Sequence, residues 1–115
     1  MKAKLKLEGR EIEISEITKA EGLKKFTGLM FKSQSKAKAL LFEFRKPTKN
    51  SIHSLFCPDF LLISLDDNNK ILEHKFVFSN KFRIKLEKEY YKLLEIPLNE
   101  KYAQVTKFFL DKTQK

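Results

Sequence analysis

The sequence GLKKFTGLMFKSQSKAKALLFEF occupies residues 22–44 and carries the strongest signals of local structure in the chain. Gly28 stands where a left-handed residue typically ends a helix, so residues 29–31 are predicted to turn back onto the core. The run SQSKAK at 33–38 has no apolar period and indicates an exposed loop. Residues 40–44 are almost continuously apolar, which is typical of a strand in the middle of a sheet.

A short helix is predicted where this stretch begins. Thr18 is followed three residues later by Glu21, which is the spacing of a capping box, in which each side chain bonds the backbone N–H of the other residue. We therefore expect a helix over about residues 19–26.

Alternation of apolar and polar residues predicts short strands on both sides of residues 22–44. Residues 3–7 and 11–14 alternate around Gly9, which predicts a hairpin. Asp and Asn at positions 66–69 favour a turn between two apolar runs, because their side chains bond their own backbone. The other predicted strands are residues 52–56, 60–65, 71–78, 82–86 and 90–96.

The last segment, residues 102–110, fits two interpretations. Val105, Phe108 and Phe109 have the spacing of a helical stripe, whereas their β-branched and aromatic character also suits a last strand. The predicted fold class is thus mainly β, a sandwich or small barrel of about eight short strands, with one short N-terminal helix and a C-terminal helix or strand.

Length and composition place limits on the class of protein. The chain of 115 residues is long enough for one core, so residues 1–115 are predicted to form a single domain. Cys57 is the sole cysteine and cannot form an internal disulfide, and no apolar leader follows Met1, so we expect a cytoplasmic protein. The apolar runs fall short of the roughly 20 residues of a membrane helix, so no membrane association is expected.

Positive charge is concentrated in one part of the sequence. The net charge is +9, and residues 24–49 hold eight lysines and arginines against the single acid Glu43. The simpler interpretation is a solvated lysine surface. The alternative is a face that binds anions, whether phosphate, carboxylate or nucleic acid.

Five segments, taken in order, resemble the family called domain of unknown function 192. They are GLMFK at 28–32, LLFEF at 40–44, IHSLF at 52–56, LD at 65–66 and LLEIP at 93–97. The resemblance covers roughly residues 20–98 and implies a compact β-sandwich or barrel. It implies no known enzymatic activity, cofactor or partner.

Several residues belong to types that carry chemistry, and each has a simpler structural interpretation. His53, Cys57 and Asp59 are potential zinc ligands, but a fourth ligand and paired spacing are missing. Cys57 with His53 is also a potential nucleophile and base. Glu43 and Glu95 are potential paired carboxylates, yet both fit the polar positions of apolar strands. We therefore predict no catalytic residues, no metal site and no cofactor.

The turn at Gly28 is the preferred candidate for a binding site. Backbone amides near a helix end, together with Lys25, Lys32 and His53, could hold a small anion or a carboxylate-bearing ligand. The simpler alternative is that residues 29–31 only anchor the core.

Three function classes follow, in order of preference. The first is a non-enzymatic domain that binds a small ligand or a protein partner between the Gly28 turn and residues 52–56. The second is a basic RNA-associated protein, because aromatic residues alternate with lysines and arginines at 75–76, 81–83 and 107–109. The third is an enzyme that uses Cys57 or His53.

Overall fold

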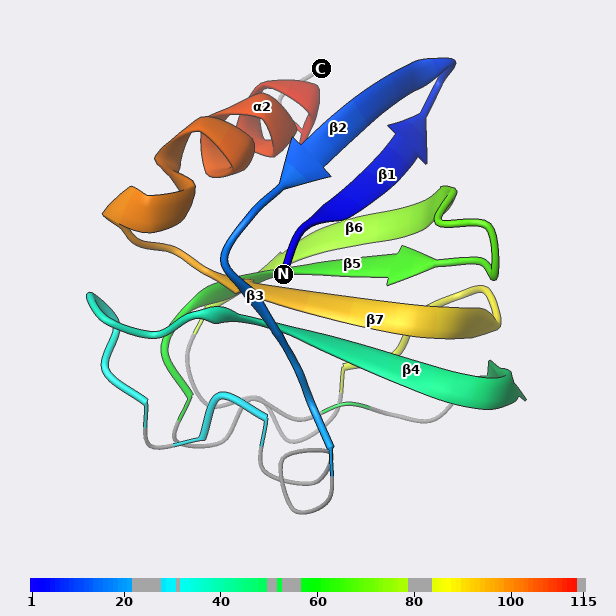
Figure 1. Cartoon of the computed structure of the whole chain (residues 1–115), viewed down its shortest axis with the longest axis horizontal. Coiled ribbons are helices and arrows are strands. Elements are labelled where there is room, and N and C mark those ends of the chain that lie inside the picture. The colour runs from blue at the N-terminus through cyan, green and yellow to red at the C-terminus, as the bar shows by residue number, and fades with distance from the viewer. Residues whose placement is uncertain (22–27, 31, 50–51, 53–56, 79–83, 114–115) are drawn as a thin grey trace.

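Strands account for most of the regular structure of the chain (Figure 1). A computed structural model describes residues 1–21, 28–30, 32–49, 52, 57–78 and 84–113. Within these residues the elements are β1 (Ala3–Leu7), β2 (Arg10–Ile14), β3 (Ile17–Lys19), β4 (Ala39–Thr48), β5 (Phe60–Leu65), β6 (Ile71–Val77), β7 (Tyr90–Pro97), the 3₁₀-helix η1 (Glu100–Tyr102) and the α-helix α2 (Ala103–Thr113).

Five of the strands form one sheet in the order β3-β4-β7-β5-β6. β3 pairs with β4 in parallel, and the other neighbours are antiparallel. β1 and β2 form a separate antiparallel hairpin, which lies over the large sheet next to α2 (Figure 1). The backbone N–H of Lys6 on β1 donates to the carbonyl of Asn69, at 2.9 Å, and so fixes the hairpin to the β5–β6 turn.

The large sheet is buried on both faces, which explains why β5 is apolar at every position except Ser64. We call the face beneath the hairpin and α2 the helix face, and the opposite face, covered by the chain connections, the loop face (Figure 1). The helix-face core holds Leu5, Ile14, Leu41, Leu61, Ile63, Leu94, Ile96 and Phe109. The loop-face core holds Ala20, Leu29, Ala37, Leu40, Phe42, Phe60, Leu62, Ile84, Leu86 and Leu93.

Tyr102 joins the C-terminal segment to the edge of the sheet. Its hydroxyl donates to the carbonyl of Glu16 at 2.6 Å and accepts from the N–H of Ala39 at 2.8 Å. The side chain is buried, and these two bonds satisfy backbone groups that precede β3 and begin β4.

Several predictions from the sequence are confirmed. The hairpin forms at 3–7 and 10–14, β5 has its predicted bounds, and β6 and β7 differ from prediction by one residue at their ends. The C-terminal segment is a helix, and Phe109 of its predicted apolar stripe is fully buried. No helix in the described part of the chain has both the length and the apolarity needed to cross a membrane.

The predicted N-terminal helix at 19–26 is wrong where the structure describes it, and residues 22–27 lie outside the described residues. Thr18 does not cap a helix; it lies in β3 opposite Leu40 of β4. The pairing of β3 with β4 leaves Ile17 only 3% exposed. The free energy gained by this burial outweighs the local preference for a capped helix.

The number of strands also differs, with seven in the described residues against about eight predicted. Of the predicted strands at 52–56 and 82–86, the structure describes an isolated bridge between Ile52 and Ile84. Residues 53–56 and 82–83 lie outside the described part. In the described sheet β3 and β6 are edge strands, so the arrangement is two packed sheets rather than a closed barrel.

Candidate ligand-binding site

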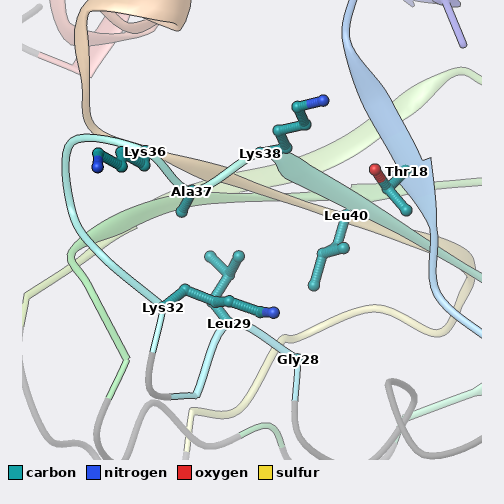
Figure 2. Close-up of a pocket in the computed structure, with 8 residues that line it drawn as sticks. All are labelled: Thr18, Gly28, Leu29, Lys32, Lys36, Ala37, Lys38 and Leu40. Atoms are coloured by element: carbon teal, nitrogen blue, oxygen red, sulfur yellow. The ribbon is translucent and has the colours of Figure 1, made fainter.

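A partly open pocket of about 250 Å³ lies on the loop face between the Gly28 turn, β3 and the start of β4 (Figure 2). Leu29 and Leu40 provide apolar surface, and Thr18 provides a hydroxyl group. The described lining residues are Thr18, Gly28, Leu29, Lys32, Lys36, Ala37, Lys38 and Leu40.

Three lysines give this pocket a positive charge. None of the eight lining residues is acidic. Elsewhere in the described chain, lysines pair with acids: Lys19 contacts Glu43 at 2.9 Å, and Lys112 contacts Glu8 at 2.8 Å. No ion pair among the described residues includes the three pocket lysines, Lys32, Lys36 and Lys38.

The three lysines differ in direction. Figure 2 shows Lys32 extending across the pocket toward Leu40, whereas Lys36 points away to the opposite side. Lys38 lies on the other wall, on the side of Thr18. The Lys38 side chain points away from Lys32 and Gly28. Lys32 is therefore the cation best placed to contact a bound anion.

The loop that carries these lysines is held by side-chain hydrogen bonds to the backbone. Gln34 Nε2 donates to the carbonyls of Asp59 and Leu98, at 3.0 and 2.9 Å, and Gln34 Oε1 accepts from Asp59 N–H at 2.7 Å. Asn99 Nδ2 donates to the carbonyls of Gln34 and Ala37, at 3.0 and 2.9 Å. The pocket wall is thus ordered before any ligand binds, which lowers the entropic cost of binding.

A buried carboxyl group lies directly behind Gly28. Glu95 of β7 is 5% exposed and belongs to the loop face, because it lies opposite Leu40. The backbone N–H of Leu29 donates to the carboxyl group. Burial raises the pKa of Glu95 to about 8, since a charged carboxylate is poorly solvated there. At neutral pH this side chain is therefore mainly uncharged.

Cys57 lies beside the same turn. Burial, with a smaller contribution from the Glu95 charge, raises the pKa of its thiol to about 11, although the Leu29 N–H opposes the shift. A thiol with so high a pKa holds little thiolate at neutral pH and is a weak nucleophile. The raised pKa therefore gives no support to Cys57 as a catalytic nucleophile.

The structure brings together two of the four predicted site residues, Gly28 and Lys32, in one pocket. The other two, Lys25 and His53, lie outside the described residues. Three further lining residues, Lys36, Lys38 and Thr18, were not predicted from the sequence. The alternation of lysine and alanine in SKAK is the signal for two of them, but it fits an exposed loop equally well.

The proposed carboxylate pair does not form. Glu43 lies opposite Lys92, whereas Glu95 lies opposite Leu40, so the two acids are on opposite faces of the sheet. Glu43 instead contacts the Nζ atoms of Lys19 and Lys92, at 2.9 and 3.8 Å. Among the described residues no group of three or more His, Cys, Asp or Glu side chains is placed to hold a metal ion.

Comparison with known proteins identifies the fold. No family model and no curated protein matches the chain. The structure resembles a "putative transcription regulator" from Sinorhizobium meliloti, with a TM-score of 0.70, 14% identity, and coverage of 91% of this chain and 84% of that one. It also resembles a protein of unknown function from Novosphingobium aromaticivorans, with a TM-score of 0.66, 13% identity, and coverage of 90% and 76%. At these identities the likeness concerns the fold alone.

Proposed function

We propose that this chain is a non-enzymatic ligand-binding domain that holds a small anion in the pocket beside Gly28. The observation that carries the proposal is a preformed pocket lined by three lysines that have no acidic partner among the described residues. Lysines around one pocket without counter-charges create a positive potential there, which attracts an anion.

The size and lining of the pocket indicate the class of ligand. A volume of about 250 Å³ is below the roughly 300–1,000 Å³ of sites for drug-sized molecules. Lys32 suits a phosphate or carboxylate group, and Leu29 and Leu40 suit a short apolar part of the same molecule. The proposed ligand is a small phosphorylated or carboxylated metabolite.

The test is calorimetry and thermal shift with a panel of small phosphates, sulfate and dicarboxylates at low ionic strength. Lys32→Glu should weaken binding by about tenfold or more, because it replaces an attractive charge with a repulsive one. Lys6→Glu on β1 makes the same change in net charge away from the pocket and should leave affinity within about twofold. Equal affinity in the Lys32 variant, or no binding by any panel member, rejects this site.

We propose nucleic-acid binding as a second function because of one exposed aromatic side chain. Phe78 is 56% exposed, and its ring stacks on Phe76 with centroids 6.4 Å apart and planes 13° apart. The structural neighbour from Sinorhizobium meliloti, which is described as a "putative transcription regulator", is consistent with this class.

Single-stranded RNA should then be retained at low salt, and affinity should fall steeply as salt is added. Phe78→Ala should weaken retention several-fold, because stacking contributes about 1–3 kcal/mol per base. Leu110→Ala on α2 also removes an exposed apolar side chain but no ring, so it is the control and should change retention little. Absence of retention at low salt excludes the second proposal.

We also propose that the chain belongs to the domain of unknown function 192 family. The order of the segments at 28–32, 40–44, 65–66 and 93–97 supports this proposal. A solved structure of a member of that family should place its Gly-Leu-Met turn over residues 28–30, against the strand equivalent to β7. A member with that turn in another layer of the fold would remove the proposal.

A further inference from the structure

Gly28 is the contact point between the pocket and the interior of the protein. It lines the pocket, and a Cβ atom at this position would lie 3.0 Å from Glu95 Oε1. The Glu95 carboxyl group is therefore separated from the pocket by the backbone of one residue that has no side chain.

The surroundings of Glu95 offer little to neutralise a negative charge. The neighbouring strands place Leu40 and Leu62 opposite it, and the turn contributes the N–H of Leu29. The titratable group that faces it from the segment before β5 is the Cys57 thiol. In the described residues no lysine or arginine forms an ion pair with Glu95.

We propose that Glu95 regulates the pocket: with a neutral carboxyl group behind Gly28 the site binds its anion, and with an ionised carboxylate there the site loses affinity. This inference depends on the proposed anion-binding function. Two negative charges on either side of a glycine backbone repel each other strongly, because the low-dielectric interior screens them poorly.

The ionisation of Glu95, and with it the loss of anion affinity, is expected in mildly alkaline solution. Because burial raises the pKa of Glu95 to about 8, the carboxyl group ionises in mildly alkaline solution. Linkage is reciprocal, so a bound anion must also make the Glu95 proton harder to remove.

The experiment measures sulfate affinity by calorimetry at pH values on both sides of the Glu95 pKa, because the charge of sulfate does not change over this range. For the wild-type protein we expect affinity to fall by about tenfold, with a midpoint near pH 8. Glu95→Gln, which is always neutral, should keep the low-pH affinity across the range. Glu43→Gln, on the opposite face of the sheet, should keep the wild-type profile.

The outcomes separate the two proposals. Sulfate binding by the wild type that does not change with pH overturns the role of Glu95 and leaves the anion site standing. No binding of sulfate or of any other panel anion by either the wild type or Glu95→Gln overturns the anion site itself. If Glu95→Gln does not fold, NMR titration of the Glu95 carboxyl carbon in the wild type replaces that variant. Saturating sulfate should raise the pH midpoint of the Glu95 titration. A midpoint that does not change with sulfate overturns the inference.

Discussion

Gly28 and Glu95 approach each other so closely that a side chain at position 28 would crowd the Glu95 carboxyl group. A Cβ atom there would lie 3.0 Å from Glu95 Oε1 and 3.6 Å from the ring of Phe42, and the backbone φ angle is 54°. Both crowding and backbone conformation therefore favour glycine at this position. The wall of the pocket and the buried face of β7 depend on each other through this one contact.

Gly28→Ala should lower the free energy of unfolding by about 2–4 kcal/mol, because left-handed strain of about 1–2 kcal/mol adds to the displacement of Glu95. Gly9→Ala is the matched control. Gly9 also has a positive φ angle, 78°, but nothing lies within 4 Å of the added Cβ, so it should lose about 1–2 kcal/mol from strain alone. Urea unfolding measures both changes, and an equal loss in the two variants would contradict the contact with Glu95.

Glu95 should make stability depend on pH. Below its ordinary pKa of 4.5 the carboxyl group is neutral in both the folded and the unfolded chain. Between that value and about 8 only the unfolded chain releases the proton, so stability falls as pH rises, by at most about 1.4 kcal/mol per pH unit. Above about 8 the folded protein ionises too, and the loss stops growing.

Glu95→Gln removes this titration, so the variant should gain stability relative to the wild type as pH rises from about 5 to about 8. Chemical denaturation of both proteins across this range gives the difference between their free energies of unfolding. The other ionisable groups contribute equally to the two proteins, so their effects cancel in this difference. Parallel profiles for the two proteins would show that Glu95 is not a buried neutral acid.

Tyr102→Phe should lower the free energy of unfolding by about 1–3 kcal/mol, because the buried N–H of Ala39 loses its acceptor. Tyr91→Phe, at a half-buried position on β7, is the control and should change stability by about 0.5 kcal/mol or less. Thermal and urea unfolding measure both. A Tyr102 variant as stable as the Tyr91 variant would mean that this hydroxyl bridge contributes nothing.

Cys57 should react slowly with thiol reagents near neutral pH, since burial raises its pKa to about 11. The alkylation rate should rise with pH up to that value, because the thiolate is the reactive form. The same chain unfolded in guanidinium is the control and should show a midpoint near the ordinary pKa of about 8.5. Rapid alkylation of the folded protein at neutral pH would restore Cys57 as a candidate nucleophile.

Local patterns in the sequence were sufficient to predict much of the sheet. Residues 60–65 and 90–96 form strands because their apolar runs bury side chains on both faces, and that requirement is visible in the sequence itself. Thr18 shows the limit of such patterns. Its capping-box spacing is a local signal, but the pairing of β3 with β4 joins residues about twenty positions apart.

The candidate site was predictable only in part for the same reason. Gly28 and Lys32 carry local signals, a turn residue and a positive charge. The hydrogen bonds that shape the pocket join Gln34 to Leu98 and Asn99 to Ala37, residues more than sixty positions apart. The burial of Glu95 likewise depends on a turn from another part of the chain, so no periodicity in β7 could reveal it.

The hydroxyl of Tyr102 has a consequence for the way the protein is made. During synthesis, the carbonyl of Glu16 and the amide of Ala39 must wait for a residue that leaves the ribosome 86 and 63 positions after them. Until then the edge formed by β3 and β4 lacks the two hydrogen bonds to the Tyr102 hydroxyl. Hydrophobic side chains of the helix-face core also remain exposed to solvent. The nascent chain therefore cannot finish its fold strand by strand, and it becomes fully packed only once Tyr102 has emerged.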